Sequence, residues 1–122
     1  MHKSKLGGFI IDCRTDDLPR AADFWSGALG MPAASVGGSY RKLHDAHLGL
    51  NIEVQQVDHP SRVHLDIETD DIEAEVERLE TLGAKRLQRV HSWWVMEAPT
   101  GQRFCVVQAM SPKFAQQATE WP

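Results

Sequence analysis

Two short segments of the sequence place polar side chains at every second position. Between residues 63 and 68, His64 and Asp66 alternate with valine, leucine and isoleucine, and between residues 48 and 55, Asn51 and Glu53 do the same. Successive side chains of a strand point to opposite faces, so each segment predicts a strand with one apolar and one polar face. Imidazole and carboxylate groups carry out general acid–base catalysis when they are desolvated, and they also bind divalent metals.

If the polar faces of several strands converge, they line one cleft. Asp12 follows an apolar run and belongs to the same set, and Cys105 lies in a third run, where both faces are largely apolar. One of the neighbours Trp93 and Trp94 faces the same side, and we take Trp94 as the candidate. The predicted cleft residues are Asp12, Asn51, Glu53, His64, Asp66, Trp94 and Cys105. The alternative is an exposed sheet face whose polar groups are simply solvated.

The chain repeats itself with a constant offset of 54 residues, which indicates an internal duplication. FIIDCRTDDL (residues 9–18) aligns with VHLDIETDDI (residues 63–72), so that three aspartates and a threonine coincide. Each block is followed by a helical pattern that ends in Leu-Gly. We therefore expect one domain over residues 1–122, built from a first module (residues 9–55) and a second module (residues 63–109).

The elements of each module follow from the spacing of apolar residues. Helices are predicted at 18–29 and 72–82, the second with Asp70 and Glu73 as an N-terminal capping pair. Its glutamates at 73, 75, 77 and 80 are expected to form a solvated face. Strands are predicted at 9–13, 33–36, 40–43, 48–55, 63–68, 86–90, 93–97 and 103–109. Each module thus has the order βαβββ, in the α+β class, and the tail after Pro112 has no clear pattern.

Composition excludes several classes of function. The chain of 122 residues has a formal net charge of −4 and no run of basic residues, which argues against a nucleic-acid partner. No apolar stretch is long enough for a membrane helix, and no signal peptide is recognisable. Cys13 and Cys105 both lie in apolar runs and are expected to be reduced, packed thiols, so we expect a cytoplasmic protein.

These segments resemble the vicinal oxygen chelate (VOC) superfamily, and most of all its glyoxalase-like domains. The resemblance runs from about Phe9 to Gln108 and includes the His-Leu-Asp of residues 64–66 and the PTGQRFC turn of residues 99–105. It implies paired βαβββ modules whose mixed sheet curls around a cleft, in a homodimer. It also implies a small-molecule ligand, which the bleomycin-resistance relatives bind without catalysis.

Members of the superfamily that use a metal place ligands on the first and last strands of each module. These places fall on Ile10, Glu53, His64 and Cys105 in this chain. Isoleucine cannot bind a metal, so the resemblance supplies His64 and Glu53 as candidate ligands but implies no complete catalytic metal site. We therefore expect a binding protein without a cofactor. The alternative is a metal-dependent lyase, isomerase or dioxygenase that uses His64 and Glu53, and the sequence leaves open whether any reaction is catalysed.

Overall fold

Two long strands, β1 (His2–Arg14) and β5 (Arg62–Thr69), each contribute residues to both of the units into which the chain divides. The first-half unit comprises residues 8–64, and the second-half unit comprises residues 1–7 and 65–122. The computed structural model describes residues 1–45 and 47–122. No helix among these residues has the length and apolar character needed to span a membrane.

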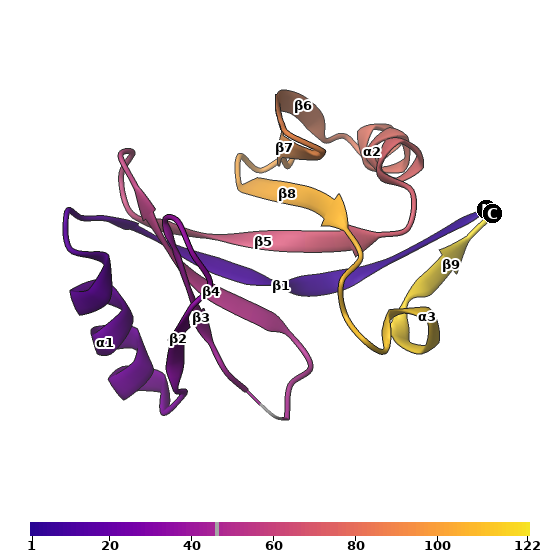
Figure 1. Ribbon diagram of the computed structural model, residues 1–122. Coiled ribbons are helices and arrows are strands. Elements are labelled where there is room, and N and C mark those ends of the chain that lie inside the picture. The colour runs from indigo at the N-terminus through magenta and orange to yellow at the C-terminus, as the bar shows by residue number, and fades with distance from the viewer. Residues whose placement is uncertain (46) are drawn as a thin grey trace. The chain divides into compact units, whose positions relative to one another are not determined.

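The first-half unit packs one helix against a mixed sheet (Figure 1). Its strands are ordered β2-β3-β4-β1, with β1 parallel to β4 and the other pairs antiparallel. The predicted helix has the expected bounds, whereas β1 begins seven residues before the predicted strand. Besides β1, the elements are α1 (Leu18–Leu29), β2 (Ala33–Ser35), β3 (Tyr40–Leu43) and β4 (Asn51–Val57).

The second-half unit repeats this plan. Its strands are ordered β5-β8-β7-β6, with β5 parallel to β8 and the other pairs antiparallel. Both units therefore have a mixed sheet and one main helix, which confirms the predicted α+β class. After β5, the elements are α2 (Ile72–Thr81), β6 (Lys85–Val90), β7 (Trp93–Glu97), β8 (Arg103–Gln108), α3 (Phe114–Gln117) and β9 (Thr119–Trp121).

The turn before each main helix makes the same hydrogen bonds in both units. The backbone N–H of Asp17 donates to the hydroxyl of Thr15, and that of Asp71 donates to the hydroxyl of Thr69. Each aspartate then accepts a hydrogen bond from the backbone N–H three residues later, so it caps the helix. The cap of α2 is therefore Asp71. The predicted cap, Asp70, was wrong, because its carboxylate accepts a hydrogen bond from the backbone of Lys3.

Each helix covers an apolar cluster on one face of its sheet. In the first-half unit, Leu18 of α1 packs with Ile11, Leu43, Ile52 and Val54. In the second-half unit, residues of α2 pack with Met96 and Val106, joined by Ile67 of β5. The sequence predicted that the whole apolar side of residues 63–67 lies under a helix. Only Ile67 does so, since the side chains of Val63 and Leu65 are 57% and 50% exposed.

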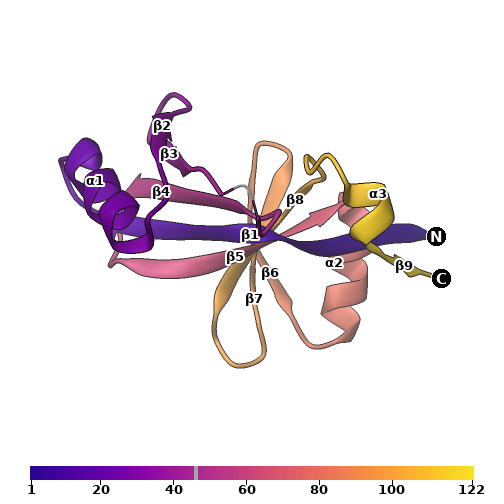
Figure 2. The ribbon, with the colours of Figure 1, turned by 90° about the horizontal axis from the view of Figure 1, so that it is seen from below.

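The two ends of the chain pair with each other in the second-half unit. Strand β9 runs antiparallel to β1, with His2 opposite Trp121 and Ser4 opposite Thr119, and the termini lie near each other in both views (Figures 1 and 2). The indole N–H of Trp121 donates to the hydroxyl of Ser4 at 2.8 Å. The tail therefore has regular structure that its sequence pattern did not predict.

Glu75 of α2 is completely buried, which corrects the prediction of a solvated face. Its carboxylate is 2.8 Å from Nε2 of the buried His2 and forms two hydrogen bonds with the guanidinium of Arg78. That guanidinium in turn lies 3.8 Å above the ring of Trp121. A buried charge must be paired, and here the partners come from the N-terminal strand and the helix itself.

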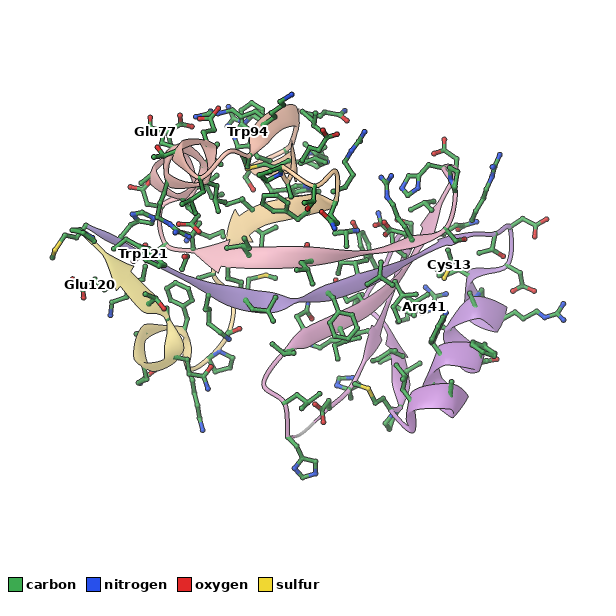
Figure 3. The ribbon with its side chains drawn as sticks, turned by 180° about the vertical axis from the view of Figure 1, so that it is seen from behind. Cys13, Arg41, Glu77, Trp94, Glu120 and Trp121 are labelled. Atoms are coloured by element: carbon green, nitrogen blue, oxygen red, sulfur yellow. The ribbon has the colours of Figure 1, made fainter. Side chains whose placement is uncertain are left out.

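We predict that Glu75→Gln destabilises the protein by about 3 kcal/mol, because the amide removes the charge that compensates Arg78 in a buried network. Urea unfolding at neutral pH would measure the loss. Glu77→Gln is the matched control, since Glu77 is exposed and points outward from α2 (Figure 3). Equal stability of the two variants would contradict this account of Glu75.

The same network predicts a dependence of stability on pH. Burial acts to raise the pKa of the Glu75 carboxyl, but hydrogen bonds from Arg78, His2 and Ser4 outweigh it and hold the pKa below its ordinary value of 4.5. The contribution of Glu75 is therefore fully present above about pH 4.5 and is lost as the pH falls through the folded-state pKa. The stability gap between the wild type and Glu75→Gln should narrow over that range, as followed by urea unfolding at stepwise lower pH.

Candidate functional site

The first-half unit has a polar sheet face opposite α1. Since Ile11, Leu43, Ile52 and Val54 face the helix, the residues between them face the other way. In the β1–β4 pair, Ile10 lies beside Glu53 and Asp12 lies beside Gln55. In the β3–β4 pair, Lys42 lies beside Glu53. We call this side the polar face. It consists of Ile10 and Asp12 of β1, Tyr40 and Lys42 of β3, Asn51, Glu53 and Gln55 of β4, and His64 of β5, which Asp12 contacts.

Asp12 is the most unusual residue of the polar face, because its carboxylate is buried with 2% exposure. One oxygen, Oδ2, lies 2.8 Å from Nδ1 of His64, whose side chain is 12% exposed. The other oxygen, Oδ1, is buried and accepts no hydrogen bond from any residue in the described part of the chain. The structure thus brings together two predicted site residues that are 52 positions apart.

Two further side chains lie near Asp12, and the sequence did not predict either contact. Nε2 of His59 and Nε of Arg62 each lie 3.8 Å from Oδ2 of Asp12. Neither residue is among the predicted cleft residues. Both side chains are partly exposed, at 33% and 40%, and they reach Asp12 because the segment before β5 returns beside the end of β1. No sequence spacing signals this contact.

Asn51 and Glu53 form a second polar pair on the same face. The Asn51 amide donates to Oε1 of Glu53 at 3.3 Å, and both side chains are half-buried. Gly8 fixes the neighbouring backbones, since a Cβ atom there would lie 1.8 Å from the carbonyl oxygen of Asn51. A glycine at this position allows β1 and β4 to approach closely.

The remaining predicted site residues belong to the second-half unit. Asp66 of β5 pairs with Cys105 of β8, so these two side chains share one face. Trp94 pairs with Val106, packs against the apolar cluster under α2, and lies on the α2 side of the sheet (Figure 3). Trp94 and Cys105 therefore lie on opposite faces. Strand alternation instead places Trp93 on the face of Cys105.

Both cysteines have free thiols, and Cys13 packs against the apolar cluster of the first-half unit. Burial raises the pKa of the Cys13 thiol, and the charge of Asp12 adds to this increase, although a hydrogen bond with Trp25 opposes it. A raised pKa keeps the thiol protonated at neutral pH. Cys13 therefore serves as a small apolar residue, as the sequence predicted.

A glyoxalase-like domain model matches residues 8–107 of the chain. The chain belongs to the glyoxalase-like family. Both the match and the two mixed-sheet units confirm the resemblance to the VOC superfamily. No curated protein matches this glyoxalase-like chain significantly.

Solved structures with the same fold include proteins of several activities. Methylmalonyl-CoA epimerase from Mycobacterium tuberculosis is 16% identical with a TM-score of 0.63, and 91% of each chain is covered. A protein of Bacillus halodurans C-125 is 12% identical with a TM-score of 0.61, over 88% of this chain and 96% of that one. A 2,2',3-trihydroxybiphenyl 1,2-dioxygenase from Sphingomonas wittichii RW1 is 15% identical with a TM-score of 0.60, over 90% of this chain and 42% of that one. At these identities, the likeness establishes the fold alone.

The first-half unit does not provide the family's metal ligands in full. Ile10 and Glu53 are direct partners in the β1–β4 pair, so the place beside Glu53 is filled by a buried hydrocarbon side chain. Potential ligands are nevertheless present. They are His64 in the first-half unit, and Asp66 and Cys105 in the second-half unit. Glu53, in the first-half unit, is a candidate from the family resemblance. A catalytic metal usually needs about three protein ligands, and Ile10 leaves the expected set incomplete.

We predict that Ile10→His increases the affinity for Ni²⁺ or Zn²⁺ by about tenfold or more, because a new imidazole would lie directly beside Glu53. Isothermal titration calorimetry on chelator-treated protein would measure the change. Val36→His, which adds an imidazole at an exposed position, is the control. Equal gains in the two variants would show that the place of Ile10 is not near a potential metal site.

Proposed function

We propose that this chain binds a small molecule at the polar face of residues 8–64, without the family's complete metal site. The observation that carries the proposal is Asp12, a buried carboxylate held by His64 with its second oxygen unpaired among the described residues. An uncompensated buried acceptor is costly for folding, and such groups are typically retained where they act on a ligand.

The neighbouring side chains support binding of a polar ligand. Asn51 supplies an amide, Glu53 a carboxylate and Lys42 an ammonium group, and all three are half-buried on the polar face. Polar groups set among buried apolar residues such as Ile10 are typical of small-molecule sites. We also propose that the protein acts as a cytoplasmic homodimer, in keeping with its family and with exposed apolar side chains such as Leu65.

A metal-dependent lyase, isomerase or dioxygenase is the second candidate, because Glu53 and His64 both belong to the polar face. Elemental analysis of protein offered nickel, zinc, manganese and ferrous iron separates the two candidates. About one metal per chain, lost in Glu53→Ala and His64→Ala, would favour the enzyme. Metal at background levels would favour the metal-free binding protein.

We predict that a ligand-observed NMR screen of small polar fragments finds binders whose signals are lost in the double variant Asn51→Ala/Glu53→Ala. Both side chains are only half-buried, so their removal should leave the fold intact. Glu77→Gln is the control and should bind as the wild type does. Fragments that bind the wild type and the double variant equally would refute the proposed function. A screen that finds no binders at all would also refute it.

A further inference from the structure

The C-terminal segment of the second-half unit, residues 109–122, lies outside the region that the glyoxalase-like model matches. It leaves the sheet at the end of β8, turns back before α3, and continues as β9 beside β1 (Figure 1). Neither α3 nor β9 contains a buried residue. Because short elements that bury so little are not stable by themselves, contacts with the rest of the unit must hold them in place.

Strand β9 is held at the edge of β1 and beside α2. Three of its residues pair with the first part of β1. The indole N–H of Trp121 donates to the hydroxyl of Ser4, which is buried, and the indole ring lies 3.8 Å from the guanidinium of Arg78. The ammonium group of Lys3 donates to the carbonyl oxygen of Ala115 at 3.2 Å. All of these partners lie on a surface that a second copy of the chain also carries.

A short turn connects these contacts to the sheet. Ser111 donates its hydroxyl to the buried Glu68 at 2.7 Å and so stays attached to β5. The next two residues, Pro112 and Lys113, are exposed. The backbone N–H of Phe114 then donates to the carbonyl oxygen of Ser111 at 3.1 Å, which folds the segment back. Straightening this turn breaks that hydrogen bond and directs α3 and β9 away from their own copy.

Release of α3 and β9 leaves two complementary surfaces exposed. The edge of β1 loses its partner, and an unpaired strand edge presents backbone N–H and C=O groups that pair readily with another chain. Arg78 loses its contact with Trp121, and the indole enters water. The segment that fits the vacated edge in register and in side chains is the same segment of a second copy. Exchange between two copies restores every contact at that edge, which makes it a low-cost route to a dimer.

We propose that two copies of this chain exchange α3 and β9, so that β9 of each copy pairs with β1 of the other. This inference rests on the proposed homodimer and specifies one contact that joins its subunits, but it does not depend on ligand binding at the polar face. Trp121 makes the same contacts in both forms, within its own copy in the closed monomer and with the other copy in the exchanged dimer. The turn at Pro112 and Lys113, together with the protein concentration, determines which form is populated.

A pair of cysteines reports which copy supplies β9. Lys3 and Glu120 lie directly opposite each other in the β1–β9 pair, so the double variant Lys3→Cys/Glu120→Cys places two thiols within reach of a disulfide. Reduced protein is incubated at about 10 µM or about 1 mM, diluted to one concentration, oxidised, and run on a denaturing gel without reductant. The exchanged form gives a covalent dimer, and we expect about tenfold more of it from the concentrated sample because mass action favours the dimer.

The single variants Lys3→Cys and Glu120→Cys are the controls for this experiment. Neither should form the covalent dimer, although both retain the free thiols of Cys13 and Cys105. Intramolecular disulfides at every concentration would overturn the exchange. If sedimentation then still showed a dimer, the proposed homodimer would stand without it. Equal yields of covalent dimer in a single variant would mean that unexchanged chains produce it by contact, which also contradicts the exchange.

A hinge variant decides the matter independently of disulfide formation. Deletion of Pro112 and Lys113 removes the turn, so β9 no longer reaches β1 of its own copy and pairs with β1 of another. We expect sedimentation velocity to show the dimer at about tenfold lower concentration than in the wild type. Adding Trp121→Ala should reverse this gain, because the anchor in the other copy is lost. A deletion variant that stays monomeric, or a gain that Trp121→Ala leaves unchanged, would overturn the exchange.

Discussion

Side-chain alternation along β1 is the constraint on which the first-half unit depends. Ile11 must face α1 to complete the apolar cluster, so Ile10 and Asp12 on either side of it must face away. A shift of one residue would bury Asp12 under the helix and expose Ile11. The close approach of Gly8 to Asn51 holds this register. The polar face, the Asp12–His64 pair and the exclusion of a ligand at position 10 all follow from it.

Local patterns in the sequence predicted the features that local interactions determine. Helix α1 has the predicted bounds, because its apolar spacing, Pro19 and the final glycine all act within one segment. Both capping aspartates end a Thr-Asp-Asp sequence that recurs in the internal repeat. The second capping residue is one position later than predicted. The polar alternation in residues 48–55 and 63–68 likewise placed Asn51, Glu53 and His64 on strands before any contact was known.

Long-range contacts could not be predicted in this way. Glu75 has the spacing of a surface glutamate, and only the N-terminal strand, 73 residues away, provides the histidine that allows its burial. His59 and Arg62 reach Asp12 through the path of a loop. The side of Trp94 depended on its pairing with Val106, since neighbouring tryptophans are equivalent in an alternating pattern. In each case, chain topology determines the partner, and composition gives no sign of it.

The pairing of β1 with β9 brings residues 2–4 and 119–121 side by side. The glyoxalase-like match ends at residue 107, so the segments that join here lie outside the shared domain, and His2 stands opposite Trp121. A short linker could connect the ends, and the turn at Gly37 and Gly38, where both residues have positive φ, offers a place to reopen the chain. Such a circular permutant would keep β9 beside β1 by covalent connection.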